Sequence, residues 1–360
     1  MTPATTSPTD RETSRGPLPA LATGLLALAV AAATVWGGLL IHFQLPAPAP
    51  LRLAVVVGWC LLGAATTLAL SWCRLHGVRR ALLLAFAAGF AALLAWWCSL
   101  SPSHEREWAD DVARLLEPEV HGDRVVLGNV RNFQWRSETD YTPRWETREY
   151  DLSRLATADL VLSYWMGPHI AHTLVSFGFD DGQRVVFSLE IRKERHESFS
   201  AFGGFVRRFE QVLVAADERD IIRTRSNARG EDVYLYRLDV TPEALRAMFL
   251  GYLVRADALQ REPDFYNTLT SNCTTVIFDI ARHVVPGLPM DHRLLLSGHF
   301  AEYVHDQGGL TPGYGYEELR ERGYINPRAL AVPGDAADEA MFSREIRRQV
   351  PGIPDAELAR

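Results

Sequence analysis

Hydrophobic residues crowd into the first hundred positions of the chain, in three runs without a charged residue: residues 20–41, 53–73 and 81–100. Each run is long enough to cross a bilayer core of about 30 Å at about 1.5 Å per residue. Backbone polar groups in lipid must be bonded within their own segment, so all three runs are predicted to be helices. We therefore expect a transmembrane anchor of three helices over residues 20–100, preceded by a disordered, Thr-, Ser- and Pro-rich cytoplasmic N-terminus over residues 1–19.

The basic residues of the connecting loops predict the orientation of this anchor. Residues 74–80 contain three arginines, whereas residues 42–52 contain one. Because arginine-rich loops stay in the cytoplasm, residues 74–80 and the N-terminus are expected inside, and everything after residue 100 outside. In a bacterium this predicts a multi-pass protein of the inner (cytoplasmic) membrane, with its C-terminal domain in the periplasm or on the outer face.

Beyond residue 100 the hydrophobic pattern is that of an α+β domain, predicted over residues 101–335 and followed by a C-terminal tail, residues 336–360. Short apolar or alternating runs predict strands, and apolar positions three or four apart predict helices. The predicted strands are residues 124–131, 159–165, 172–179, 184–192, 211–215 and 231–238, and the predicted helices are residues 103–116, 242–260, 273–284 and 298–305. Strands come largely before helices, which favours an antiparallel sheet packed on helices.

The segment Asp180-Asp181-Gly182 is a strong hairpin signal between two of these strands. If the loop has three residues and Gly182 is left-handed, counting back along both strands puts His172 directly opposite Glu190. A two-residue turn would shift the register and turn Glu190 to the other face of the sheet. The hairpin therefore predicts a histidine and a carboxylate in contact.

Composition narrows the candidate chemistry. The formal net charge of −7 gives no sign of a nucleic-acid partner. Three of the four cysteines lie in the hydrophobic region, so Cys273 is the single thiol of the soluble domain and cannot form a disulfide within it. The pair His169 and His172 lacks an obvious third ligand, so no metal and no cofactor is expected.

Cys273 follows the capping residue types Ser271 and Asn272 at the predicted start of a helix. Free backbone N–H groups and the helix dipole at such a position stabilise a thiolate, which is the reactive form in cysteine catalysis. Position alone is equally typical of a small buried cysteine at a helix start. With His172 as base and Glu190 orienting its ring, the residues predict a Cys-His-Glu triad.

Six segments between residues 122 and 285 occur together in a recognisable order: residues 129–133, 144–152, 172–179, 190–194, 229–234 and 265–275. They resemble the Lnb N-terminal periplasmic domain family, named for a bacterial lipoprotein N-acyltransferase. More distantly, a strand histidine followed by Asn-Cys at a helix start is similar to circularly permuted papain-like (NlpC-type) enzymes such as lecithin:retinol acyltransferase. The resemblance implies Cys273 as nucleophile and His172 as base. This chain differs from the name-giving enzyme in carrying its membrane helices before the domain.

The residues and the resemblance together predict a thiol acyltransferase that acts at the membrane. Its acyl donor would be a phospholipid, and its acceptor a lipoprotein or other amine. The Cys273 backbone N–H, with Asn272 or Tyr164, is the expected oxyanion site. Arg192, Tyr266 and Asn267 are the expected substrate contacts. A cysteine peptidase or amidase acting on peptidoglycan, and a non-catalytic envelope binding module, are the alternatives.

Overall fold

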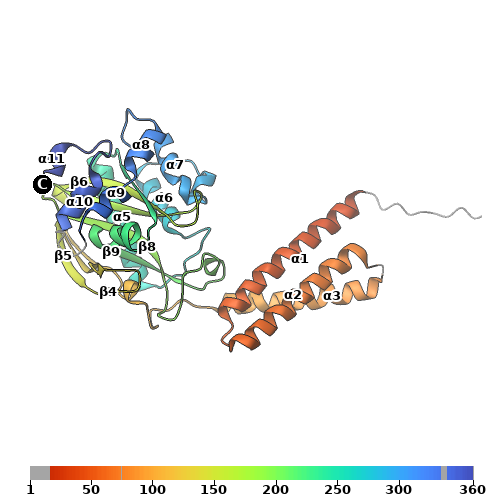
Figure 1. The fold of residues 1–360 in the computed structure, drawn as a ribbon. Helices are drawn as coiled ribbons and strands as arrows, with labels where there is room; N and C mark the ends of the chain where they lie inside the picture. Colours follow the sequence, from red (N-terminus) through yellow and green to blue (C-terminus); the bar gives the residue numbers. More distant parts are fainter. Residues whose placement is uncertain (1–16, 74, 334–338, 360) are drawn as a thin grey trace, which may run out of the picture. The chain divides into compact units, whose positions relative to one another are not determined.

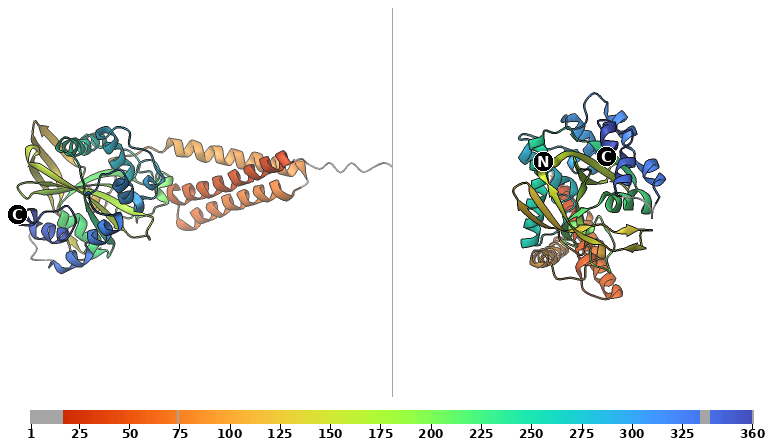
Figure 2. Two further views of the ribbon diagram at one scale, coloured as in Figure 1. Left: turned by 90° about the horizontal axis from the view of Figure 1, so that it is seen from above. Right: turned by 90° about the vertical axis from the view of Figure 1, so that its left-hand side faces the viewer.

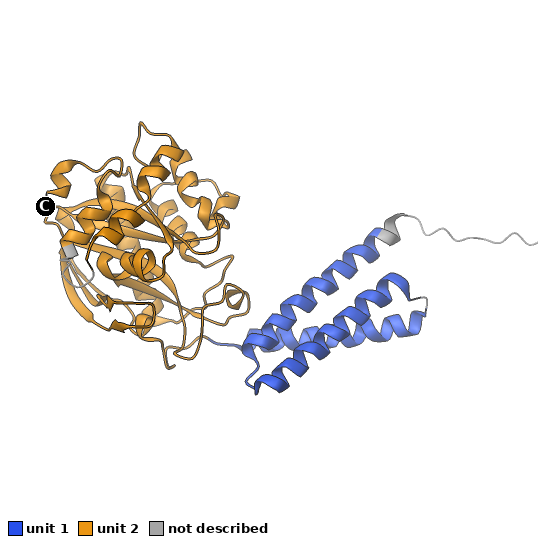
Figure 3. Ribbon diagram, in the orientation of Figure 1, with its two compact units in different colours: residues 1–101 blue, residues 102–360 orange. Residues whose placement is uncertain are grey.

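The computed structural model describes residues 17–73, 75–333 and 339–359, so the predicted disorder of residues 1–16 lies outside the described residues. The chain forms two compact units, residues 1–101 and residues 102–360 (Figures 1 and 3). The first unit holds α1 (Pro17–Gln44), α2 (Ala49–Trp72) and α3 (His76–Ser99). The three predicted helices are confirmed, and each is long and apolar enough to cross a membrane.

The three helices lie side by side around a small aromatic core (Figure 2). Trp59 stacks on Phe86 with ring centroids 4.8 Å apart, and its indole N–H donates to the Thr34 carbonyl at 2.9 Å. Many large apolar side chains instead point outward, including Leu28, which is 67% exposed, and Leu61, which is 64% exposed. Outward-facing leucines are typical of helices solvated by lipid, so the first unit is consistent with a membrane anchor.

The second unit is built around one large β-sheet. Among the described residues it has eight strands, in the order β1-β2-β9-β8-β7-β6-β10, with β5 paired to β2. Neighbouring strands run antiparallel except β2 and β9, and a separate pair is formed by β3 and β4. The strands are β1 (Glu117–His121), β2 (Arg124–Arg131), β3 (Gln134–Trp135), β4 (Tyr141–Thr142), β5 (Trp145–Asp151), β6 (Leu155–Tyr164), β7 (Ala171–Phe179), β8 (Arg184–Arg192), β9 (Glu210–Ala216) and β10 (Asp232–Arg237).

Helices cover both faces of the sheet. Val175 and Phe187 face a cluster with α5 (Pro242–Arg261) and α6 (Cys273–Val284), whereas Leu174 and Val186 face a cluster with α4, α9 and α10. Alternate residues of a strand point to opposite faces, and both faces of β7 and β8 are buried, which explains their nearly continuous apolar sequence. The predicted α+β class is confirmed. The other helices are α4 (Glu218–Arg223), α7 (Phe300–Asp306), α8 (Tyr316–Gly323), α9 (Asn326–Ala331), α10 (Glu339–Arg347) and α11 (Asp355–Leu358).

Two predictions about the ends of this domain are wrong. Residues 103–116 form no long helix, only a 3-10 turn at Asp110–Val112, because their backbone bonds to the sheet instead. The Ala109 N–H donates to the Lys193 carbonyl at 3.0 Å, which removes it from any helical ladder. The predicted tail, residues 336–360, contains α10, whose Phe342, Ile346 and Arg347 are fully buried against the sheet. Its apolar positions complete the core, so it belongs to the folded unit.

Candidate active site

The β7–β8 hairpin has the predicted register. Gly178 pairs with Arg184, the Phe179 N–H donates to the Gln183 carbonyl at 3.0 Å, and Gly182 has φ +91°. Glycine populates this left-handed region without the steric cost of a Cβ, so the three-residue loop closes as expected. The predicted contact follows: Nε2 of His172 lies 3.2 Å from Oε1 of Glu190.

Cys273 is the first residue of α6, and the residues around it build a complete helix cap. The Asn272 side-chain oxygen accepts from the N–H groups of Thr274 and Thr275, both at 2.9 Å. The Thr275 hydroxyl oxygen accepts from the Asn272 N–H at 2.8 Å, which completes a capping box. The cap fixes the thiol in the first turn, at the positive end of the helix dipole.

The thiol of Cys273 is buried and lies close to the ring of His172, so that each group affects the ionisation of the other. Burial alone would disfavour the thiolate, but the charge and hydrogen bond of His172, with a hydrogen bond from the Thr173 backbone, hold the pKa of Cys273 below its usual value. Burial likewise disfavours the imidazolium, yet the charges of Glu190 and Cys273 raise the pKa of His172 to about 9. Both shifts favour the thiolate–imidazolium form of the pair over its neutral form.

A carboxylate, a hydroxyl and a guanidinium hold His172 from its other side. The Ser188 hydroxyl lies 2.7 Å from Nε2 of His172 and donates to Oε1 of Glu190 at 2.8 Å. Arg225, nearly buried, donates to the same Glu190 oxygen at 2.7 Å. Since Nε2 faces these groups, Nδ1 is the ring nitrogen left for the thiol. Although burial opposes ionisation, His172 and Arg225 hold the pKa of Glu190 well below its usual range.

Sequence reasoning missed Ser188 and Arg225. Ser188 could have been found, because it lies two residues before Glu190 and so shares its face of the strand. Arg225 lies in a single π-helical turn, Thr224–Ala228, and the pattern of hydrophobic and polar residues does not predict such a turn. Such turns recur at functional sites, and this one delivers a buried cation to the triad carboxylate.

Tyr266 is the predicted substrate contact that lies beside the nucleophile. It lies close enough to Cys273 for the two groups to affect each other's ionisation. Burial, and the nearby charges of Cys273 and Glu190, raise the pKa of Tyr266 well above its usual value, so it stays a protonated donor. The phenol and the Cys273 N–H are therefore the candidate hydrogen-bond donors to an oxyanion formed next to the sulfur.

The two side chains predicted as oxyanion donors are engaged elsewhere. The Asn272 amide N–H donates to the Thr268 carbonyl at 2.8 Å, and its oxygen is used by the helix cap. The Tyr164 hydroxyl donates to the Gly298 carbonyl at 2.6 Å. In the structure backbone groups at a helix start and in a neighbouring loop bind these polar atoms, and their role as oxyanion donors stays a prediction.

Two predicted substrate contacts are structural. The Arg192 guanidinium is buried, donates to the carbonyls of Val112 at 3.1 Å and Ala113 at 2.7 Å, and lies over the Trp108 ring. It therefore binds the entering chain to the sheet and not a lipid phosphate. The Asn267 side-chain oxygen accepts from the N–H groups of Leu269 and Thr270, so it shapes the loop before the nucleophile.

No group of three or more metal-ligating residues occurs among residues 17–73, 75–333 and 339–359. The Nδ1 atom of His169 lies 2.9 Å from Nε2 of His299, away from the His172 ring. His169 and His172 thus have separate partners.

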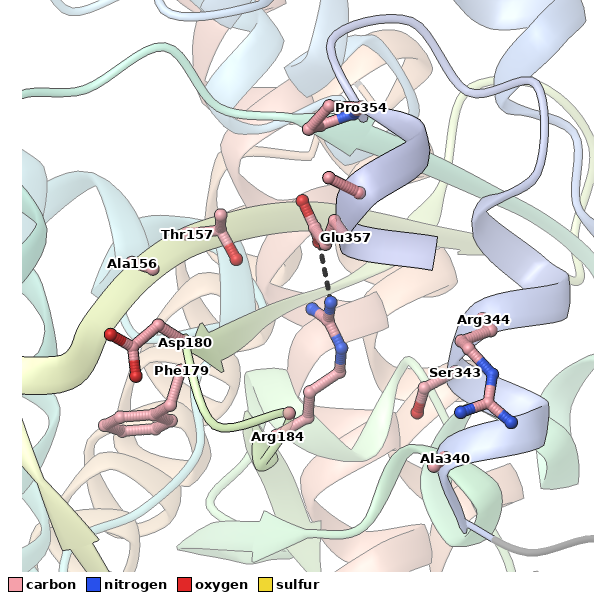
Figure 4. A pocket seen from close by; sticks show the side chains of 12 residues that line it. Ala156, Thr157, Phe179, Asp180, Arg184, Ala340, Ser343, Arg344, Pro354 and Glu357 are labelled. Carbon is pink, nitrogen blue, oxygen red and sulfur yellow. Dashed lines mark hydrogen bonds and ion pairs between the residues drawn. The ribbon is translucent and has the colours of Figure 1, made fainter. Parts of the chain in front are cut away.

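Two pockets flank the sheet at its opposite ends. One, of about 190 Å³, lies at the turn of the β7–β8 hairpin and is lined by Phe179, Asp180 and the 2.6 Å ion pair of Arg184 with Glu357 (Figure 4). It lies at the far end of β7 from His172. The other, of about 480 Å³, is lined by Tyr164, Trp165, Tyr234, Arg229 and Arg320, among others. Because Tyr164 pairs with Ala171, this pocket is at the triad's end of the sheet.

Comparison with known proteins gives one family. A model of the Lnb N-terminal periplasmic domain matches residues 141–298, a segment that includes His172, Glu190 and Cys273. Comparison with curated proteins and with solved structures gave no match. The matched segment runs from β4 to the loop before α7 and so contains the central strands and α6. The chain therefore has three helices able to span a membrane and, within its second unit, a segment, residues 141–298, that is similar to the Lnb N-terminal periplasmic domain family.

Proposed function

We propose that this protein is a membrane-anchored cysteine acyltransferase of the bacterial inner membrane, with its catalytic domain on the periplasmic or outer side. It would move an acyl chain from a phospholipid to an amine, such as the N-terminus of a lipoprotein. The observation that carries the proposal is the buried chain of contacts from the Cys273 thiol through His172 to Glu190. A binding module has no need of such an arrangement, and the resemblance to the Lnb family supports acyl transfer.

In the first half-reaction the Cys273 thiolate attacks the carbonyl carbon of a phospholipid ester. A Cys273 thioester forms, the ester C–O bond breaks, and the His172 imidazolium gives its proton to the leaving alkoxide of the lysophospholipid. With its pKa raised to about 9, His172 is mostly protonated at neutral pH and ready to act as this acid. Glu190 stabilises the imidazolium before the proton leaves.

In the second half-reaction an amine attacks the thioester. Neutral His172 accepts the proton of the attacking amine, an amide forms, and the C–S bond breaks to return the thiolate. The developing oxyanion of both steps would accept hydrogen bonds from the Cys273 backbone N–H and the Tyr266 hydroxyl. Exclusion of water from the buried thiol favours transfer to an amine over hydrolysis.

We also propose that the fold is a circularly permuted papain-like one. The strand that carries the histidine, β7, precedes the helix that carries the cysteine, α6, and several strands lie between the two in the chain. The ring of His172 nevertheless reaches the N-terminus of α6. This order and contact support the likeness to permuted papain-like enzymes that the sequence suggests.

The test is to trap the intermediate. Purified full-length protein incubated with phospholipid should accumulate an acyl mass on the Cys273 peptide, and a diacylated lipopeptide with a free amine should remove it and become N-acylated. Cys98→Ser provides the matched control, since it removes an exposed thiol and should leave acylation unchanged. Cleavage of peptidoglycan stem peptides without acylation of Cys273 would establish the peptidase alternative. Acylation followed only by release of fatty acid would establish a phospholipase.

A further inference from the structure

Large apolar side chains are exposed on three loops that adjoin the triad. They are Trp165, Met166, Phe199, Phe202 and Leu269, each between 40% and 62% exposed, and together we call them the apolar rim. Isolated exposed hydrophobic residues are ordinary on a soluble domain, but a cluster that includes two phenylalanines, a tryptophan and a methionine marks an interaction surface.

Contacts between the loops hold the apolar rim together. The rings of Trp165 and Phe199 meet edge to face with centroids 5.8 Å apart. The Thr268 hydroxyl, next to Leu269, donates to the Ala201 carbonyl at 3.0 Å, which ties the loop before the nucleophile to the loop of Phe202. The three loops therefore form one surface rather than three separate tips.

The apolar rim lies at the end of the sheet that carries the triad. Trp165 follows Tyr164, whose cross-strand partner Ala171 directly precedes His172. Leu269 lies four residues before Cys273 in a loop bonded to the start of β9: the Tyr266 N–H donates to the Phe209 carbonyl at 2.9 Å. A substrate entering toward the thiol from this end would pass the rim.

The chain also enters the second unit at this end. The Ser103 N–H donates to the Glu210 carboxylate at 3.2 Å, and Arg106 pairs with Glu210 at 3.0 Å and with Glu194 at 3.1 Å. Glu194 and Glu210 bracket the loop of Phe199 and Phe202. The last apolar helix ends at Ser99, and only three residues separate it from Ser103, a stretch of chain that can reach about 14 Å at most.

We propose that the apolar rim docks onto the lipid bilayer and inserts its aromatic and methionine side chains into the headgroup region. Tryptophan and phenylalanine favour this interfacial layer, where an apolar ring is removed from water. The nearby basic residues Lys193, Arg195 and Arg208 pair with Asp111, Asp110 and Glu197, so the rim offers apolar side chains to the bilayer and not a basic patch. The docking does not depend on the acyltransferase chemistry, although it would open the triad directly toward phospholipid.

The test uses the full chain with all four native cysteines replaced by serine, so that catalysis plays no part. Met166→Cys and Phe202→Cys each receive a nitroxide spin label, as do two control positions, Leu330→Cys and Met341→Cys. The controls are 61% and 39% exposed hydrophobic residues on α9 and α10, away from the rim loops. The labelled proteins are reconstituted in vesicles of phosphatidylethanolamine and phosphatidylglycerol. Collision of each label with oxygen and with a water-soluble nickel chelate is then measured by power saturation.

Labels at Met166 and Phe202 should collide more with oxygen than with the nickel chelate, at depths of about 5–10 Å below the lipid phosphates, and the control labels should show the reverse. Rim labels that behave like the controls would overturn the proposal. Spin–spin broadening that disappears on dilution with unlabelled protein would assign the rim to a second copy of the chain and would overturn it as well. Thermal unfolding of each labelled protein shows whether it is folded. Because two rim positions are labelled, the test can still be read if one variant fails to fold.

Discussion

Replacing Glu190 by glutamine should weaken the Cys273 thiolate without touching the thiol. Oε1 of Glu190 lies 3.2 Å from Nε2 of His172, and the two side chains are only 18% and 14% exposed. The substitution keeps the size and one oxygen of the side chain but removes its charge. Arg225 keeps its positive charge nearby and then opposes the imidazolium without compensation.

The size of the effect follows from the geometry. Two unit charges about 4 Å apart interact by about 4 kcal/mol at an effective dielectric constant of about 20. The rise in the pKa of His172 from 6.5 to about 9 corresponds to about 3 kcal/mol, and Glu190 is its largest favourable source. Loss of most of this energy should reduce the thiolate–imidazolium population at neutral pH by roughly tenfold to a hundredfold.

The assay is the rate of alkylation of Cys273 by iodoacetamide, followed by the mass of its peptide, in a chain whose three other cysteines are serine. Wild type should react rapidly below the ordinary thiol pKa of about 8.5, because a thiolate is already present there. Glu190→Gln should lose this reactivity and approach wild type only when the pH exceeds the ordinary thiol pKa of about 8.5, where the thiol ionises without help from His172.

Glu194→Gln is the matched control, since Glu194 is a similarly buried carboxylate, 20% exposed, that pairs with Arg106 and not with His172. It should leave the alkylation profile unchanged. Identical profiles for Glu190→Gln and Glu194→Gln, in two proteins with unchanged thermal unfolding, would refute the role given to Glu190.

Three further outcomes are expected. Tyr266→Phe should lower the rate of Cys273 acylation by about tenfold to a thousandfold with little change in alkylation, since only an oxyanion donor is lost; equal loss in both assays would contradict this. Arg347→Ala should lower the free energy of unfolding by about 3–5 kcal/mol in thermal or denaturant unfolding, because Asp159 and Glu218 stay buried without the cation that pairs with them. Arg348→Ala, which removes only an exposed ion pair, should change the free energy of unfolding by less than about 1 kcal/mol. Against the effect of burial, Arg237 and Arg347 hold the pKa of Asp159, and Arg347 that of Glu218, below the usual range, so the contribution is complete above about pH 5 and is lost as the pH falls through those depressed values. A C-terminal alkaline phosphatase fusion should be active in a Gram-negative host, and activity restricted to a cytosolic reporter would contradict the predicted orientation.

Local patterns in the sequence determined the membrane helices, the central strands and the pairing at the hairpin. An uncharged run as long as a bilayer is thick permits only a helix, and a three-residue loop with Gly182 in the left-handed region fixes the register of β7 and β8. The contact of His172 with Glu190 follows from that register. Cys273 at a capped helix start was readable for the same reason, since a cap uses residues adjacent in the chain.

Only the tertiary structure decided which polar groups complete the site. Asn272 and Tyr164 carry suitable donors, but backbone carbonyls of Thr268 and Gly298 bind them, and these carbonyls are found only once the chain is folded. Arg225 reaches Glu190 across 35 residues through a π-helical turn. Residues 103–116 have a helical pattern, yet hydrogen bonds of Glu107 and Ala109 with Arg195 and Lys193, just past the end of β8, keep this stretch out of a helix. Each outcome depends on long-range hydrogen bonds that satisfy buried backbone groups, and such partners leave no periodic signal in the sequence.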